Sequence, residues 1–213
     1  MTRSHFGDLQ FFHSMADEEN VPAAETRQKA LDWIQFAWRV FSKEISPDAL
    51  LKTVDIPTIQ KHFGCSEWSV SDIYILGRAD KLRARISDIA FGSVLHTVQD
   101  SFAAAHTQRE IPVKGETCTG TASALARPGR IIEFHTYGAQ DGTKHDEGDQ
   151  RMAMAIGARD RWPEAVAVTR QLFEYWDSNA PWETARPYLE CVYELSAGNR
   201  PSSPGDEYKR VAR

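Results

Sequence analysis

Residues 71–105 carry an apolar periodicity that commits this part of the chain to helical packing. Apolar side chains recur there mostly three or four positions apart, the spacing of one face of an α-helix: Ile73, Ile75, Leu76, Leu82, Ile86, Ile89, Ala90, Val94 and Leu95. Charged residues flank the first half, whereas the half after Asp88 is nearly uncharged and is predicted to be buried. We expect one long helix, or two that break near Gly77, ending around residue 105.

Most of the remaining chain is also predicted to be helical. A wide apolar stripe marks a helix at 23–43, and capping residues followed by proline, Ser46-Pro47 and Asp55-Ile56-Pro57, mark two more. Further helices are expected at 8–16 (with Asp8 as N-cap), 145–158, 163–176 and 181–195, with a long loop at 107–130 and a short extended run at 131–137. The predicted fold is all-α: one multi-helix domain over 1–195 and a flexible or loosely docked tail over 196–213.

Composition narrows the possible partners and compartments. The net charge of −5 over 213 residues gives no general attraction to nucleic acid or anionic lipid. Three cysteines, Cys65, Cys118 and Cys191, are too few and too widely spaced for a zinc finger or a disulfide framework, and their odd number favours a reducing compartment. No long apolar run is present at the start, so we expect no transmembrane segment and a cytoplasmic location for the chain as given, or secretion if the natural protein is longer.

Two polar residues stand out in the uncharged half of the first segment: His96 and Asp100. Residues four apart on an α-helix lie one above the other, so both side chains can point into one small volume, as two metal ligands would. His106 falls about a third of a turn off this face, given about 3.6 residues per turn. It can join the pair only if the helix ends near Ala104 or Ala105.

A second pair with the same spacing is His145 and Asp149, predicted at the start of a helix. With His5 these residues form a set of imidazole and carboxylate groups without thiolates, which suits Zn²⁺ or another first-row divalent ion. Each pair can also be an ordinary surface ion pair or a solvated helix start. For Asp100 the metal interpretation is favoured, because a carboxylate in an apolar helix half is costly to bury unless it is paired or bound to metal.

The order and spacing of these residues resemble the zinc-dependent phospholipase C and single-strand-specific nuclease superfamily. The pattern is a histidine, an aspartate four residues on and a histidine six further, then a histidine with a carboxylate at plus four, preceded by a Ser-His-Phe element. The matching residues are His5, His96, Asp100, His106, His145 and Asp149. The resemblance implies an all-helical fold around a trinuclear zinc cluster.

The resemblance also implies a role for each ligand. His5 and His96 would bind one zinc ion, and Asp100 would bridge it to a second ion. His106, His145 and Asp149 would hold another zinc, with Asp149 standing where the phospholipases often have Glu. The family's remaining zinc uses groups of a processed N-terminal residue and an upstream aspartate, and only four residues precede His5 here. We therefore expect two or three zinc ions, depending on whether the chain is a fragment.

Four further residues are candidates for the site. Asp8 and His13 could replace missing ligands, although a core histidine bonded to a neighbour is an equally good interpretation of His13. His135 is a weaker candidate for an additional metal or site position. Arg109, in the long loop that leaves directly after His106, could bind a phosphate group.

The expected activity is zinc-dependent hydrolysis of a phosphodiester, in which metal-activated water attacks phosphorus and Asp100 and His96 are catalytic. The acidic balance and the absence of a basic stripe favour a phospholipid or other phosphodiester substrate over a stable nucleic-acid complex. Two alternatives stay open: a single-strand-specific nuclease of the same superfamily, and a non-enzymatic helical interaction domain with a vestigial metal site.

Overall fold

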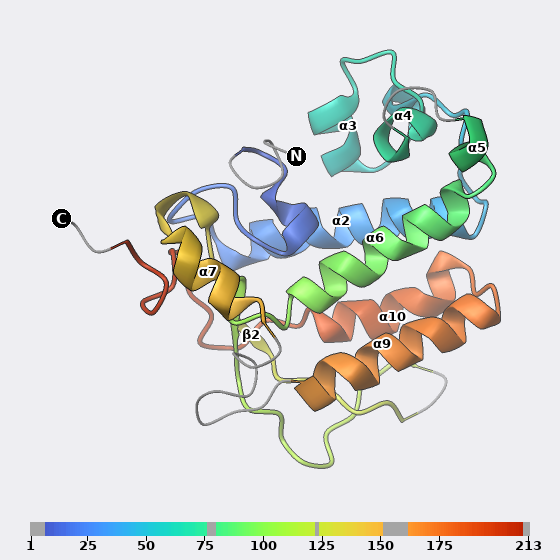
Figure 1. Cartoon of the computed structure of the whole chain (residues 1–213). Coiled ribbons are helices and arrows are strands. Elements are labelled where there is room, and N and C mark those ends of the chain that lie inside the picture. Colours follow the sequence, from blue (N-terminus) through green and yellow to red (C-terminus); the bar gives the residue numbers. More distant parts are fainter. Residues whose placement is uncertain (1–6, 76–79, 122–123, 151–161, 211–213) are drawn as a thin grey trace.

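Helices form most of the structure, a computed structural model that describes residues 7–75, 80–121, 124–150 and 162–210 (Figure 1). The prediction of a mostly helical chain is confirmed, although a two-stranded sheet is present that the all-α prediction leaves out. The elements in chain order are η1 (Gln10–His13), α2 (Ala23–Phe41), η2 (Leu51–Thr53), α3 (Pro57–Phe63), α4 (Val70–Tyr74), α5 (Asp80–Arg83), α6 (Ile86–Asp100), β1 (Thr107–Arg109), β2 (Ile131–Phe134), η3 (Tyr137–Ala139), α7 (Gly142–Gly148), α9 (Trp162–Asp177) and α10 (Trp182–Val192).

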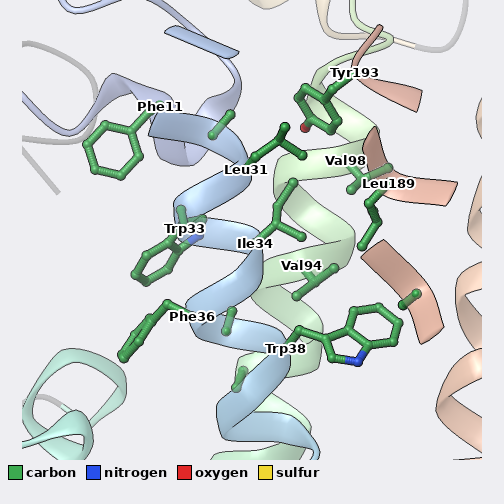
Figure 2. Packing of buried hydrophobic residues seen from close by; sticks show 14 of the residues in the cluster. Phe11, Leu31, Trp33, Ile34, Phe36, Trp38, Val94, Val98, Leu189 and Tyr193 are labelled. Atoms are coloured by element: carbon green, nitrogen blue, oxygen red, sulfur yellow. The ribbon is translucent and has the colours of Figure 1, made fainter. Parts of the chain in front are cut away.

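Helices α2 and α6 pack against each other and form the centre of the core (Figure 2). Leu31 and Ile34 of α2 lie beside Val94 and Val98 of α6, and Leu189 of α10 approaches from a third side. All five side chains are buried. Because burying a side chain of this size contributes about 1.5–3 kcal/mol, this contact fixes the position of α6 on α2.

The other side of α2 anchors η1, the 3₁₀ turn that ends at His13. Phe12 stacks on Trp33 with ring centroids 4.0 Å apart, and Phe11 is fully buried. Figure 2 shows Phe11 and Trp33 on the side of α2 that faces away from Leu189. The helix predicted over 8–16 is thus reduced to one turn without a side-chain cap, and aromatic packing holds it in place.

Asp32 of α2 caps the N-terminus of α3 from the neighbouring helix. Its Oδ2 accepts hydrogen bonds from the backbone N–H of Thr58 (3.1 Å) and from the Thr58 hydroxyl (2.6 Å), and its Oδ1 accepts one from Gln28 (2.6 Å). The prediction that Asp55 caps this helix is wrong, because the N-cap residue is Ile56 and no adjacent side chain supplies the bond. A buried carboxylate from a distant residue takes the role.

Segment 71–105 contains α4, α5 and α6, and the position of the predicted break at Gly77 lies outside the described residues. Helix α6 ends at Asp100 rather than near residue 105. The carbonyl of Thr97 in its last turn accepts from the N–H of Ser101 (3.3 Å) and lies within hydrogen-bond distance of the Ser14 hydroxyl (2.8 Å) and the Tyr193 hydroxyl (3.0 Å). These buried hydroxyls surround the last turn of the helix, and the chain turns away over 101–106.

Helix α7 begins at Gly142, three residues before the predicted start at His145. Asp141 is its N-cap, and the Asp141 carboxylate accepts hydrogen bonds from the backbone of Thr143 (3.0 Å) and Lys144 (3.3 Å). Most of the predicted remainder of this helix, 151–158, lies outside the described residues. Helices α9 and α10 agree with the predicted spans within a few residues.

Residues 107–130, predicted to be one long loop, are tied to the core. Strand β1 at the start of this segment pairs antiparallel with β2, which confirms the extended run predicted from residue 131. A disulfide joins Cys118 to Cys191 of α10, with the two Cα atoms 5.7 Å apart. This pairing corrects the expectation of reduced cysteines, because disulfides are typical of oxidising environments.

The C-terminal segment 196–210, predicted to be a flexible or loosely docked tail, runs along the folded domain. Backbone hydrogen bonds join it to residues 20–21, 131–132, 136 and 139–141. Ser202 and Gly205 are buried. A local sequence rich in Gly, Pro and Ser predicts no regular element, but pairing with distant backbone orders the segment.

The arrangement places η1, α7 and the C-terminal segment near the C-terminal end of α6. Figure 1 shows α7 and the C-terminal segment at this end of the molecule, whereas α5 lies at the N-terminal end of α6.

Of the helices in the described part of the chain, none has both the length and the apolar character needed to cross a membrane.

Replacing Cys118 and Cys191 together with serine should lower the free energy of unfolding by about 2–4 kcal/mol, because the disulfide closes a loop of 73 residues in the unfolded chain. Urea denaturation followed by circular dichroism measures this change. Cys65→Ser is the matched control, since Cys65 is exposed and unpaired, and should leave the midpoint unchanged. Equal stabilities for the double variant and the control would contradict the disulfide.

Asp32→Ala should destabilise the protein by about 1–3 kcal/mol, because buried donors at the start of α3 lose their acceptor. Asp55→Ala should change the free energy of unfolding by no more than about 0.5 kcal/mol, since Asp55 is exposed. The same denaturation experiment compares both variants. A larger effect from Asp55 than from Asp32 would show that the cap is assigned to the wrong residue.

Candidate metal centre

Six side chains gather near the C-terminal end of α6 in two groups of three. The first cluster consists of His13, His96 and Asp100, and the second cluster consists of His106, His145 and Asp149. Within each cluster, one ligand-type atom from every residue lies within 4.8 Å of the others. These are the only such groups of three or more in the described ranges of the chain.

The first cluster joins η1 to the last turns of α6. His13 Nδ1 lies 2.9 Å from Asp100 Oδ2 and 3.0 Å from His96 Nε2. His96 Nε2 is 3.3 Å from the same Asp100 oxygen, as expected for residues one helical turn apart. The side chain of His96 is 54% exposed, so this cluster is open to solvent on one side.

The second cluster joins the turn after α6 to helix α7. His106 Nε2 lies 3.0 Å from Asp149 Oδ1, and His145 Nε2 lies 3.2 Å from Asp149 Oδ2. The rings of His106 and His145 stack with centroids 4.9 Å apart. The requirement that the helix end before His106 is therefore met, because the turn over 101–106 brings its imidazole to Asp149.

The two clusters lie next to each other at Asp100 and His106. Asp100 Oδ2, which contacts both histidines of the first cluster, is 3.7 Å from Nδ1 of His106. The backbone carbonyl of His13 accepts a hydrogen bond from the same nitrogen at 2.7 Å. His13 therefore belongs to the first cluster through its ring and orients the second cluster through its carbonyl.

Hydrogen placement on His106 shows that this cluster fits a cation. A carbonyl oxygen only accepts, so the bond to the His13 carbonyl puts a hydrogen on Nδ1 of His106 and leaves the lone pair of the neutral ring on Nε2. This Nε2 is buried, and its contact with Asp149 lacks hydrogen-bond geometry. A lone pair facing a carboxylate is stable only if a proton or a metal ion lies between them.

The electrostatics of the second cluster agree with this interpretation. Burial alone acts to raise the pKa of Asp149, but close contacts with His106 and His145 outweigh it and hold that pKa well below the usual value. Burial acts to lower the pKa of His106, yet its contacts with Asp149 and Asp100 raise it overall. An ionised carboxylate beside two imidazoles attracts a positive charge, which a proton on His106 or a bound metal ion could supply.

In the first cluster, partial burial is the largest influence on the pKa of His96. It lowers the pKa of His96, with the neighbouring His13 and His106 acting in the same direction and Asp100 opposing them. A histidine must be neutral to coordinate a metal, so this shift favours the form that binds.

The predicted ligands fall in three categories. His96, Asp100, His106, His145 and Asp149 come together in the clusters, whereas His5 lies outside the described residues. Asp8 is in neither cluster, and its carboxylate contacts His62 Nδ1 at 2.8 Å. His135 is also in neither cluster; it is buried with Nδ1 3.1 Å from the carbonyl of Ala105 and lines a polar cavity of about 660 Å³ beside the C-terminal segment.

His13, named from the sequence as a possible replacement for a missing ligand, is a member of the first cluster. It lies 83 residues before His96, outside the spaced pattern, and follows two aromatic residues that suggest core packing. One sequence signal for this role was that His13 directly follows the aromatic pair Phe11-Phe12. The packing of these two rings directs the next residue toward α6.

Arg109, expected to bind phosphate, instead donates hydrogen bonds to three backbone carbonyls inside the fold. Its guanidinium donates to the carbonyls of Ser101 (2.7 Å), Gly129 (2.9 Å) and Val192 (2.9 Å) and lies 4.4 Å over the ring of Phe102. The residue is only 4% exposed. Arg109 thus joins the end of α6 to the following loop and to α10, and the phosphate-binding assignment is corrected.

A groove of about 610 Å³ opens beside both clusters. Asp100 and Asp149 each contribute to its wall, and the opposite wall is formed by α9. Val166 and Phe173 of α9 are 37% and 44% exposed there, and Arg170 lies between them in the sequence. The remaining lining residues are Gln99, Ala103, Ala165 and Thr169.

Two clusters of imidazole and carboxylate groups lie side by side, with Asp100 of the first 3.7 Å from His106 of the second, and each contributes its carboxylate to one groove. No protein family, curated protein or solved structure matches the chain.

Proposed function

We propose that this chain is a zinc-dependent phosphodiester hydrolase of the phospholipase C type. The observation that carries the proposal is the pair of adjacent clusters, each with two imidazoles and one carboxylate, which approach to 3.7 Å at Asp100 and His106. Such mixed nitrogen and oxygen donors suit Zn²⁺, and three protein ligands leave a coordination position open, as in catalytic zinc sites. The resemblance in ligand order supports the same assignment.

The residues of this chain have distinct roles in the proposed reaction. Zinc supplies a bound water with a pKa near 7 and a positive charge for the phosphoryl oxygens. Asp100 lies where the two clusters meet, so its position sets their separation. His96 lies on the side of the first cluster that is open to solvent. Asp149 stays ionised because of its contacts with His106 and His145.

The groove beside the clusters favours an ester with an apolar part. Its α9 wall exposes Val166 and Phe173, and Arg170 is the one cationic residue among the described residues that line it. A polynucleotide normally requires several phosphate-neutralising Lys or Arg side chains. A single arginine with apolar neighbours is better matched to one phosphodiester attached to a hydrophobic group.

The chain prepared without chelator should contain at least two zinc ions, one for each cluster. His96→Ala and His145→Ala should each lower the count by one, because each removes one of three ligands from a different cluster. Elemental analysis by mass spectrometry measures the count. His62→Ala is the control, since His62 contacts Asp8 outside both clusters, and should retain the wild-type count. A wild-type protein that binds no zinc would refute the metal centre.

The zinc-loaded chain should hydrolyse phosphatidylcholine faster than single-stranded DNA, and should also cleave a generic nitrophenyl phosphodiester. His96→Ala should lower the rate at least about 100-fold, which corresponds to roughly 2.7 kcal/mol of lost transition-state stabilisation. His62→Ala should retain activity.

Two results would change this assignment. Faster cleavage of single-stranded DNA would identify a nuclease. A zinc-loaded protein that leaves every substrate intact would refute the catalytic function and leave a metal-binding domain.

A further inference from the structure

We propose that Gln140 is a positioning residue for the second cluster, which fixes the tautomer and orientation of His145. The inference rests on the metal centre of the proposed function. Gln140 is fully buried at the end of η3, and its Oε1 lies 2.6 Å from Nδ1 of His145. It does not belong to either ligand set, so it acts through the imidazole.

The orientation of the Gln140 amide follows from its other partners. Its Nε2 donates to the carbonyl of Ala105 at 2.8 Å and to the carbonyl of Pro204 at 2.7 Å. Both partners are acceptors only, and a flipped amide would direct its oxygen at two other oxygens. The amide oxygen must therefore face His145, and it can only accept.

The state of His145 follows from this orientation. Its Nδ1 carries the hydrogen that Gln140 accepts, so the Nε2 of the neutral ring presents its lone pair toward Asp149. The same logic applies to His106, which donates from Nδ1 to the carbonyl of His13. Both imidazoles of the second cluster thus offer Nε2 to one point, as metal-bound histidines with a fixed outer partner do.

Four hydrogen bonds with the C-terminal segment hold Gln140 and its two neighbours in place. Pro204 accepts from its side chain, and the guanidinium of Arg210 donates to its backbone carbonyl at 2.7 Å. The backbone of Asp141 donates to the carbonyl of Tyr208 at 2.8 Å, and the backbone of Arg210 donates to residue 139 at 3.2 Å. The segment predicted to be a flexible or loosely docked tail therefore supports one of the two clusters.

Tyr208 also contacts the helix that carries two of the ligands. A Cβ placed on Gly148 would lie 2.6 Å from a Tyr208 ring carbon and 2.7 Å from Cβ of Ala105, so only glycine fits between them. This close packing fixes α7 immediately before Asp149. The first cluster, in contrast, is built from η1 and α6.

The test measures metal affinity one cluster at a time in the full-length chain. His96→Ala isolates the second cluster and His145→Ala isolates the first. Gln140→Met keeps the side-chain volume but loses the acceptor. Gln140→Glu, in the neutral acid form that the facing carbonyls of Ala105 and Pro204 favour, keeps an acceptor for His145 and a donor for one of these carbonyls. Zn²⁺ affinity is measured by competition with a chelator, and visible absorption of bound Co²⁺ reports the ligand geometry.

Gln140→Met should weaken Zn²⁺ binding about 10–100-fold in the His96→Ala background, as loss of an outer partner does, and should change the Co²⁺ spectrum. It should leave affinity in the His145→Ala background unchanged. Gln140→Glu should bind at least tenfold more tightly than Gln140→Met at the second cluster. This rescue separates positioning of His145 from a general packing effect.

Three outcomes would overturn the inference: a loss of less than about twofold at the second cluster, equal losses in both backgrounds, or no rescue by Gln140→Glu. If Gln140→Met does not fold, the test uses Gln140→Glu alone. A Zn²⁺ affinity at the second cluster near that of the His96→Ala parent supports the role, and a tenfold loss refutes it. A wild-type chain that binds no metal refutes the proposed function. A chain that binds metal equally well with Met at this position refutes only the role of Gln140.

Discussion

The hydroxyl groups of Ser14 and Tyr193 both lie within hydrogen-bond distance of the Thr97 carbonyl in the last turn of α6, and 2.7 Å from each other. This carbonyl also accepts the helix hydrogen bond from the N–H of Ser101 at 3.3 Å, so the buried hydroxyls form a side-chain network where the chain turns away after Asp100. If α6 continued as a straight helix, His106 would point about a third of a turn away from Asp100. The second cluster depends on this termination, because it brings His106 to Asp149 and next to the carboxylate of the first cluster.

His13 connects the two clusters through two different chemical groups. Its imidazole contacts Asp100, and its carbonyl holds the hydrogen on Nδ1 of His106. Each contact requires η1 to stay where the stack of Phe12 on Trp33 places it. The polar centre is therefore positioned by the aromatic core beside it, since a shift of η1 would move a ligand and an orienting group together.

The features predicted from the sequence are those that depend on neighbours in the chain. Residues at i and i+4 on a helix meet wherever that helix is placed, so the pairs at 96–100 and 145–149 could be recognised from spacing alone. The broad apolar stripe of α2 likewise predicted a buried helix. The side chains that support a helix or a cluster from a distant part of the chain could not be recognised from spacing. Asp32 caps a helix 26 residues away, and Gln140 meets Pro204 across 64 residues.

The sequence by itself determined the helical class and the two ligand pairs, because helical periodicity and four-residue spacing are local properties. Tertiary structure alone decided that His13 joins the first cluster and that Cys118 pairs with Cys191. It also decided that the C-terminal segment is ordered, through backbone hydrogen bonds that its composition does not encode. These contacts join residues far apart in the chain, and the packing of η1, α6 and α10 around α2 brings them together.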